Sequence, residues 1–142
     1  MKILITGITG RIGANLAARL SEEGHEVRGL VWPKDPRTEK LVPLGVDLVE
    51  GTLTEVDDVN KVVHGMEVVY HLGAAFQGGG PFSENDYFDI NIRGTFNVLE
   101  AARTNPRLRH LLFASTDAQY EKYPPDGLDK LIREDEMQIE PS

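Results

Sequence analysis

The first thirteen residues constrain the fold of this chain more than any other stretch. Lys2–Thr6 is an apolar run that predicts a buried strand, and glycines follow it at positions 7, 10 and 13. Gly7 lets the chain turn where the strand ends, Gly10 lets the backbone approach an anion without a Cβ, and Gly13 lets a helix pack closely. The apolar spacing of Arg11–Glu23 predicts that helix. Its N-terminus offers unpaired N–H groups and a partial positive charge, so the stretch predicts a pyrophosphate-binding turn.

Apolar runs alternate with helical patterns along the rest of the chain. We expect further strands at Glu26–Val31, Val46–Glu50, Met66–His71 and Leu108–Ala114. Between them we expect a short helix at Thr38–Leu44, a helix capped by Thr54 with Asp57, and a long helix from Ser83, capped with Asp86, to Thr104. The strands are continuous apolar runs, so both faces of their sheet should be covered. The pattern predicts one α/β domain over residues 1–142, a three-layer, doubly wound parallel sheet of the Rossmann type with strand order 3-2-1-4-5.

That strand order also predicts where a ligand binds. In a doubly wound sheet the ligand crevice lies at the carboxyl ends of the strands where the winding reverses, here the first and the fourth strand. Gly7–Ile12 and His71–Ala75 should therefore be neighbours. The glycines of Gly78–Gly80 indicate a loop near this crevice.

Composition narrows the classes of function. The net charge of −8 argues against general nucleic-acid binding, which needs a basic surface, but not against an anionic cofactor held by backbone N–H groups. No apolar run approaches the ~20 residues of a membrane span, and the chain begins with a strand and not with a signal peptide, so we expect a cytoplasmic protein without membrane contact. Cysteine is absent and His71 has no ligand partners at metal-site spacing, so no metal site is expected.

Five segments together resemble one family. They are Thr6–Gly13 (TGITGRIG), Gly51–Leu53 (GTL), His71–Ala74 (HLGA), Asn91–Thr95 (NIRGT) and Phe113–Tyr120 (FASTDAQY). Their order and spacing are similar to those of the extended short-chain dehydrogenase/reductases, the NAD-dependent epimerase/dehydratase family. The resemblance covers essentially the whole chain, but only about the first half of the usual length of the family.

The resemblance implies a site for NAD or NADP. It implies contacts to the pyrophosphate from Gly7, Thr9, Gly10, Arg11, Ile12 and Gly13; to the adenine from Thr52 and Leu53; and to the ribose and the nicotinamide-side phosphate from Leu72, Gly73 and Ala74. Asn91 would act from inside its helix, on neighbouring loops or on a water molecule.

The cofactor preference depends on the end of the second strand. The acidic residue that binds the ribose 2′-OH of NAD in the family is replaced by Val31. Lys34 and Arg37 follow it, with Arg11 in the glycine turn, so a 2′-phosphate would meet cations and no repelling carboxylate. We therefore favour NADP over NAD. Trp32 either stacks on the adenine or covers the helix beside it.

The resemblance also implies catalytic residues. Thr116, four residues before Tyr120, takes the position of the family's Ser/Thr hydroxyl. Asp117 matches the acid of the sugar-nucleotide 4,6-dehydratases, the alternative being a turn-forming or capping aspartate. Ala118 replaces the glutamate that those dehydratases need, which argues against a dehydratase. The family's Tyr-x-x-x-Lys pair, a tuned acid–base group, does not occur, so we expect the N-terminal part of a longer enzyme, inactive alone.

Three functions remain open from the sequence. The first is an NAD(P)-dependent oxidoreductase, epimerase or dehydratase-type enzyme that transfers hydride at a carbinol or ketone, often in a nucleotide sugar. The second is a non-catalytic dinucleotide sensor on the same fold. The third is a free-standing nucleotide-binding module, which the apolar edge strand Leu108–Ala114 disfavours. The resemblance also implies a homodimer, with the Ser83–Thr104 helix as the candidate interface.

Overall fold

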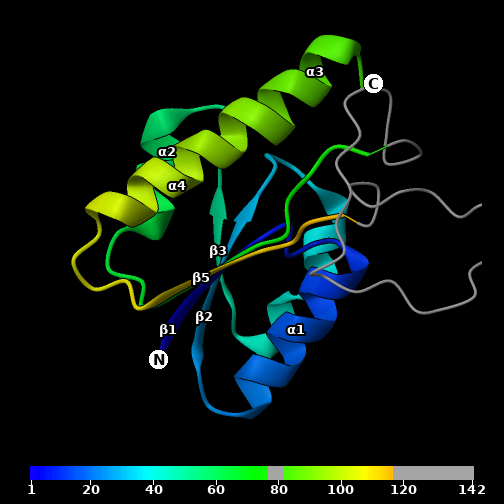
Figure 1. Cartoon of the computed structure of the whole chain (residues 1–142). Helices are drawn as coiled ribbons and strands as arrows, with labels where there is room; N and C mark the ends of the chain where they lie inside the picture. The colour runs from blue at the N-terminus through cyan, green and yellow to red at the C-terminus, as the bar shows by residue number, and fades with distance from the viewer. Residues whose placement is uncertain (77–81, 117–142) are drawn as a thin grey trace, which may run out of the picture.

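The structure, a computed structural model, describes residues 1–76 and 82–116. Five parallel strands form one sheet in the order β3-β2-β1-β4-β5 (Figure 1). They are β1 (Lys2–Thr6), β2 (Glu26–Val31), β3 (Asp47–Glu50), β4 (Val68–His71) and β5 (His110–Phe113). The predicted fold class and strand order are confirmed. β1 and β2 have the predicted bounds, whereas the last three strands are slightly shorter than predicted.

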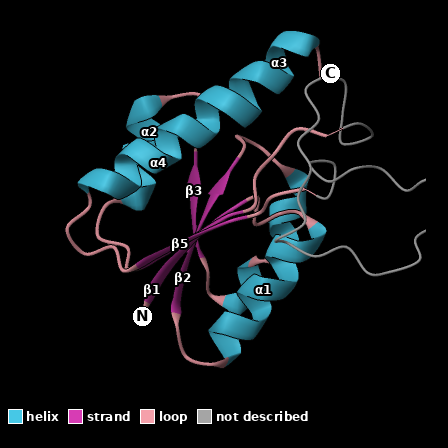
Figure 2. Cartoon of the chain, viewed as in Figure 1, coloured by secondary structure: helices cyan, strands magenta, loops and turns pink. Residues whose placement is uncertain are grey.

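Helices cover both faces of the sheet (Figure 2). On one face lie α1 (Arg11–Glu22) and two short 3-10 helices, η1 (Pro36–Lys40) and η2 (Val42–Leu44). On the other lie α2 (Val56–Val63), α3 (Glu84–Phe88), the π-helical segment η3 (Asp89–Arg93) and α4 (Gly94–Thr104). Each face buries its own apolar core: Ile3 and Ile5 of β1 face α1, whereas Leu4 faces α2 and α4. The alternation of side chains along β1 thus produces the three layers.

Two predicted helices differ from the observed ones. Thr38–Leu44 is not one helix but two 3-10 helices that meet at Leu41, where Pro43 offers no N–H to continue the first. The Ser83–Asp86 capping box forms as predicted, with Asp86 N donating to Ser83 Oγ over 3.3 Å. The helix that follows is interrupted by the π-helical turn of η3, a feature that often coincides with functional positions.

The predicted cap of α2 is wrong. α2 begins after Glu55, and no side chain caps it. The Thr54 hydroxyl instead bonds to the hydroxyl of Thr52 over 2.6 Å. Asp58, and not Asp57, accepts from the backbone N–H of Thr52 at 2.9 Å. These contacts fix the loop between β3 and α2.

None of the helices in the described part of the chain is long and apolar enough to cross a membrane. Within residues 1–76 and 82–116, His, Asp and Glu side chains also form no group of three that could bind a metal ion.

Candidate functional site

The turn after β1 leaves the start of α1 open to an anion. Gly7 has φ 70°, and the N–H of Gly10 donates to the Gly7 carbonyl over 3.0 Å, which closes the turn. Gly10 is the N-cap of α1, and it provides no side-chain cap. The first turn of α1 carries no acidic residue. The N-terminal N–H groups of this 12-residue helix therefore form a ready site for a phosphate.

The loop after β4 touches this turn through its backbone. Thr6 and His71, at the ends of β1 and β4, are paired in the sheet. A Cβ on Gly7 would lie 2.8 Å from the backbone nitrogen of Gly73. The N–H of Gly73 donates to Thr6 Oγ1 over 3.1 Å. The predicted neighbourhood of Gly7–Ile12 and His71–Ala75 is confirmed.

A cavity of about 460 Å³ lies over these strand ends. Twelve of the predicted cofactor residues line it: Gly7, Thr9, Gly10, Arg11, Ile12, Gly13, Trp32, Thr52, Leu53, Leu72, Gly73 and Ala74. Of the other predicted residues in the described part of the chain, Lys34, Asn91 and Thr116 are not among its lining residues. Asp117 lies outside the described residues.

The helix formed by η3 and α4 holds the loops that border the cavity. Asn91 clamps the backbone of Ala75: its Oδ1 accepts from the Ala75 N–H at 2.8 Å and its Nδ2 donates to the Ala75 carbonyl at 2.9 Å. Buried Asn97 donates to the carbonyl of Leu53 over 2.9 Å. One helix face therefore fixes the loop after β4 and the loop after β3. The sequence motifs pointed to Asn91 but not to Asn97.

His71 connects three elements below the cavity. Its Nδ1 lies 2.7 Å from Thr6 Oγ1, its Nε2 lies 3.0 Å from Thr95 Oγ1, and its ring stacks on Phe113 with centroids 5.6 Å apart. Burial lowers its pKa to about 4, so the ring is neutral at physiological pH. These contacts give His71 a structural role.

Asp35 does not line the cavity but contacts Thr9 and Arg37, which do, and the family motifs did not indicate it. Its side chain is 3% exposed, and it accepts hydrogen bonds from Thr9 Oγ1 at 3.0 Å and from the Arg37 guanidinium at 2.8–3.1 Å. The hydrogen bonds from the Arg37 side chain are the largest cause that lowers the Asp35 pKa to about 2. Lys40 Nζ donates to the Thr9 carbonyl over 2.9 Å. The Asp35-Pro36 pair, typical of a helix start, was the available sequence signal, and Asp35 does cap η1.

The end of β2 carries no carboxylate into the cavity. Val31, at the position of the family's acidic residue, is buried and lines the cavity. Arg37 also lines it and is 57% exposed despite its pair with Asp35. Lys34 instead occupies a tight turn with φ 60°, where its backbone N–H donates to Glu50 at 3.3 Å.

Comparison with known proteins identifies the family. The model of the NAD dependent epimerase/dehydratase family matches residues 3–141. The chain belongs to this family. The resemblance seen in the sequence motifs is thus confirmed.

Curated relatives in the family are longer than this chain. GDP-mannose 3,5-epimerase 1 from Oryza sativa subsp. japonica is 35% identical over 127 residues, which cover 87% of this chain and 32% of that protein. The 2-alkyl-3-oxoalkanoate reductase from Stenotrophomonas maltophilia is 33% identical over 130 residues, covering 90% and 38%. The chain thus spans between about a third and two fifths of the length of these relatives.

Solved structures are similar over the same region. A short-chain dehydrogenase/reductase superfamily protein from Agrobacterium tumefaciens with bound NAD is 28% identical and covers 100% of this chain and 40% of that one, with a TM-score of 0.76. A mutant uronate dehydrogenase from the same organism, complexed with NAD, is 26% identical and covers 87% and 43%, with a TM-score of 0.66.

Proposed function

We propose that this chain is the dinucleotide-binding part of an NAD(P)-dependent oxidoreductase or epimerase that acts on a carbinol or ketone. The observation that carries the proposal is the cavity over the ends of β1 and β4, at the uncapped start of α1. Its lining residues fit a dinucleotide, because backbone N–H groups would meet the phosphates and Trp32 would stack on the adenine. Hydride transfer is the chemistry that a dinucleotide held there would supply. The related proteins solved with NAD support the assignment.

We propose Thr116 and Asp117 as the catalytic residues that this chain contributes. Ala114 directly follows β5 and lines the cavity. Thr116 lies two residues further along the chain. Its hydroxyl would hydrogen-bond the reacting oxygen of the substrate, and Asp117 would act as an acid. The sequence contains no Tyr-x-x-x-Lys pair. We therefore expect no hydride transfer from the chain alone, and we propose a cytoplasmic location for the protein.

We propose NADP as the preferred cofactor. Val31 leaves the adenosine end of the cavity without a carboxylate, and Arg37 and Arg11 both line that cavity. Arg37 is held by Asp35 and remains half exposed, so its outer N–H groups can donate to a 2′-phosphate. Lys34 is not needed for this preference, because it does not line the cavity.

The fluorescence of Trp32 tests both proposals. It is the only tryptophan of the chain and lines the cavity, so a stacked adenine should quench it. We expect NADP to bind more tightly than NAD, and Arg37→Gln to weaken NADP on the order of tenfold more than it weakens NAD, because only NADP carries the 2′-phosphate. Arg19→Gln, an exposed arginine of α1 paired with Glu23, is the matched control. If neither dinucleotide binds, the function is wrong; if NAD binds more tightly, only the NADP preference is wrong.

The alternative is a non-catalytic dinucleotide sensor on the same fold, whose full-length chain would lack the Tyr-x-x-x-Lys pair. Both proteins would bind the cofactor, so binding does not separate them. Oxidation of NADPH by the full-length protein in the presence of ketone substrates does. Tight binding without any turnover across a broad ketone set would support the sensor.

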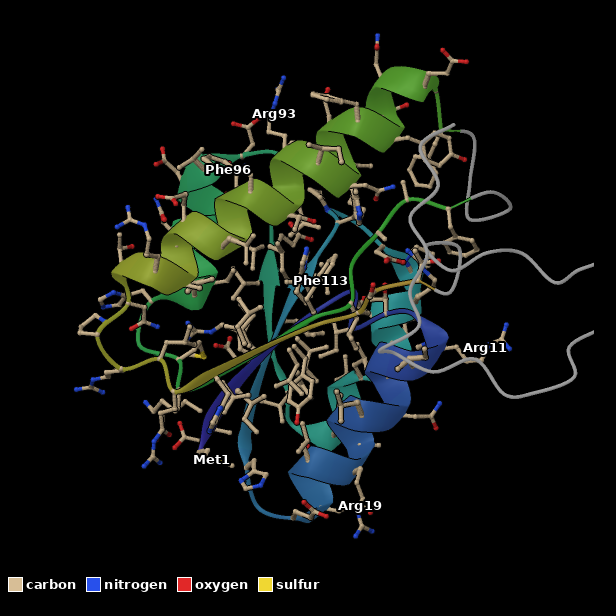
Figure 3. All side chains as sticks on the ribbon, in the orientation of Figure 1. Met1, Arg11, Arg19, Arg93, Phe96 and Phe113 are labelled. Carbon is tan, nitrogen blue, oxygen red and sulfur yellow. The ribbon has the colours of Figure 1, made fainter. Side chains whose placement is uncertain are left out.

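We also propose that two copies of the chain pair through the outer face of the α3–η3–α4 helix. Four large apolar side chains lie 3 or 4 positions apart along this face and are 46–61% exposed: Phe88, Ile92, Phe96 and Leu99. Figure 3 shows Arg93 and Phe96 on the side of the helix away from the sheet. An antiparallel pairing of two copies, centred between positions 93 and 94, sets Phe88 opposite Leu99 and Glu84 opposite Arg103. Such a pairing buries every apolar residue of the stripe and joins opposite charges.

A further inference from the structure

We propose that Asp35 and Lys40 are positioning residues for the phosphate-binding turn and act on it through Thr9. This inference rests on the proposed dinucleotide binding. Both residues come from the segment after β2, far from the turn in sequence: Asp35 lies 26 positions after Thr9, and Lys40 lies 31 positions after it. Neither residue belongs to the glycine motif.

Lys40 fixes the peptide group between Thr9 and Gly10. The carbonyl oxygen of this group accepts from Lys40 Nζ at 2.9 Å, and its N–H donates to the Gly7 carbonyl at 3.0 Å. The peptide plane is therefore held at both ends. Because Gly10 is the N-cap of α1, the next backbone N–H groups are those that would meet a phosphate. Their directions depend on the plane that Lys40 holds.

Asp35 fixes the side chain of the same threonine. Thr9 is buried, and its hydroxyl donates to Asp35 Oδ2 at 3.0 Å. The carboxylate in turn is held by the guanidinium of Arg37 and by the N–H of Arg37 at 2.9 Å. With Arg37 paired to it, this carboxyl has a pKa of about 2, so it stays an acceptor at physiological pH. Thr9 is thus held at two points: its hydroxyl bonds to Asp35, and its carbonyl accepts from Lys40.

These two hydrogen bonds matter for binding because they order the turn before the ligand arrives. A turn that is already fixed loses little conformational freedom when a pyrophosphate binds. If either hydrogen bond is removed, part of the binding free energy is used to order Thr9 and Gly10. Each loss should weaken ligands that contact the turn by about 3- to 10-fold. Ligands that touch only the adenosine end of the cavity should not be affected.

The test compares ligands that contain the pyrophosphate with one that does not. Calorimetry measures the affinities of NADP, NAD, inorganic pyrophosphate and adenosine for the wild-type chain and for Lys40→Met, Asp35→Asn and Thr9→Val. We expect each variant to weaken the first three ligands by a similar factor and to leave adenosine unchanged. Thr9→Ser keeps the hydroxyl and should restore binding. Lys61→Met, on the exposed side of α2, is the matched control.

The outcomes separate this inference from the proposed function. If the variants weaken adenosine by the same factor as pyrophosphate, the contacts merely support the fold and the inference is wrong. Unchanged pyrophosphate binding in Lys40→Met and Thr9→Val would equally overturn it. If the wild-type chain binds neither dinucleotide nor pyrophosphate, the proposed function fails and the inference fails with it. Lys40→Arg keeps the charge, so wild-type affinity in this variant at low salt that is lost as salt rises would assign Lys40 an electrostatic role and contradict the positioning role.

Discussion

Gly7 and Gly24 adopt nearly the same left-handed backbone conformation, with φ 70° and 80°, in different surroundings. A Cβ on Gly7 would lie 2.8 Å from Gly73 N, whereas a Cβ on Gly24 would meet no described atom within 4 Å. Gly24→Ala should therefore lower the free energy of unfolding by only about 1 kcal/mol, the cost of placing alanine in the left-handed conformation. Gly7→Ala adds a contact between two backbones, and we expect about 1–3 kcal/mol more. Urea unfolding measures the difference, and equal losses would show that the loop after β4 moves aside freely.

His71 should make the stability of the protein depend on pH. Its pKa is lowered from 6.5 to about 4 by burial, so between these values the unfolded chain binds a proton that the native state does not. The contribution to stability is complete above pH 6.5 and is lost as the pH falls towards 4, by up to about 3 kcal/mol. The free energy of unfolding, measured across this range, should fall accordingly.

Substitution of His71 isolates this contribution. His71→Gln should remove that part of the pH dependence, because glutamine can still hydrogen-bond but does not titrate. His64→Gln, at the exposed end of α2, is the control and should keep it. An unchanged slope in His71→Gln would mean that another group causes the loss.

At the scale of elements, the helix made of η3 and α4 should control the loop between β3 and α2. Asn97→Ala removes the hydrogen bonds to the carbonyls of Leu53 at 2.9 Å and Thr54 at 3.4 Å. A part-buried carbonyl without its partner should cost on the order of 1 kcal/mol in the free energy of unfolding. We expect faster hydrogen exchange at the amides of residues 51–55, while the amides of β1 stay protected. Asn60→Ala, an exposed asparagine of α2, should leave both unchanged.

Local sequence patterns predicted the elements whose bounds are set locally. β1 and β2 are apolar runs that end in a glycine turn or at Pro33, and their bounds match. The Ser83 capping box also formed, since its groups lie three residues apart. Thr54 failed as a cap because Thr52 offered its hydroxyl a nearer partner. The π-helical segment was not predictable in this way, since the contact of Asn91 with Ala75 spans 16 positions.

In the candidate site, too, some features could be predicted from the sequence and others depend on contacts between distant residues. The glycine turn and the loop after β4 were predicted as neighbours, because the rule for doubly wound sheets needs only the strand order. The role of Asp35 was not predicted, since its hydrogen bond from Thr9 spans 26 positions. The sequence places three cations near the cofactor, and only the structure separates Arg11 and Arg37, which line the cavity, from Lys34, which does not.

At the scale of the whole molecule, the α3–η3–α4 helix has two faces with different roles. Its inner face holds the loops that border the cavity, through Asn91, Thr95 and Asn97. Its outer face carries the exposed apolar stripe of Phe88, Ile92, Phe96 and Leu99. If two copies pair through the stripe, the helix that holds the cofactor loops lies at the centre of the dimer.

Sedimentation equilibrium tests this pairing. We expect Phe96→Glu to raise the dimer dissociation constant at least about tenfold, because two-fold symmetry places the new charge in the interface twice. Val42→Glu is the matched control, since Val42 is equally exposed but belongs to η2 on the opposite face of the sheet. A wild-type chain that remains monomeric at tens of micromolar would contradict the proposal.

Charge exchange then tests the antiparallel geometry itself. In that arrangement Glu84 of one copy faces Arg103 of the other, although within one copy Arg103 pairs with Glu100 at 2.8 Å. Glu84→Arg alone should weaken the dimer, because it sets two arginines against each other, whereas the double variant Glu84→Arg, Arg103→Glu should restore it. The restored pair lies near the rim, so its effect should shrink as salt screens the charges. If the double variant is as weak as the sum of its single variants, the two helices meet in another register, even where Phe96→Glu has shown that they meet.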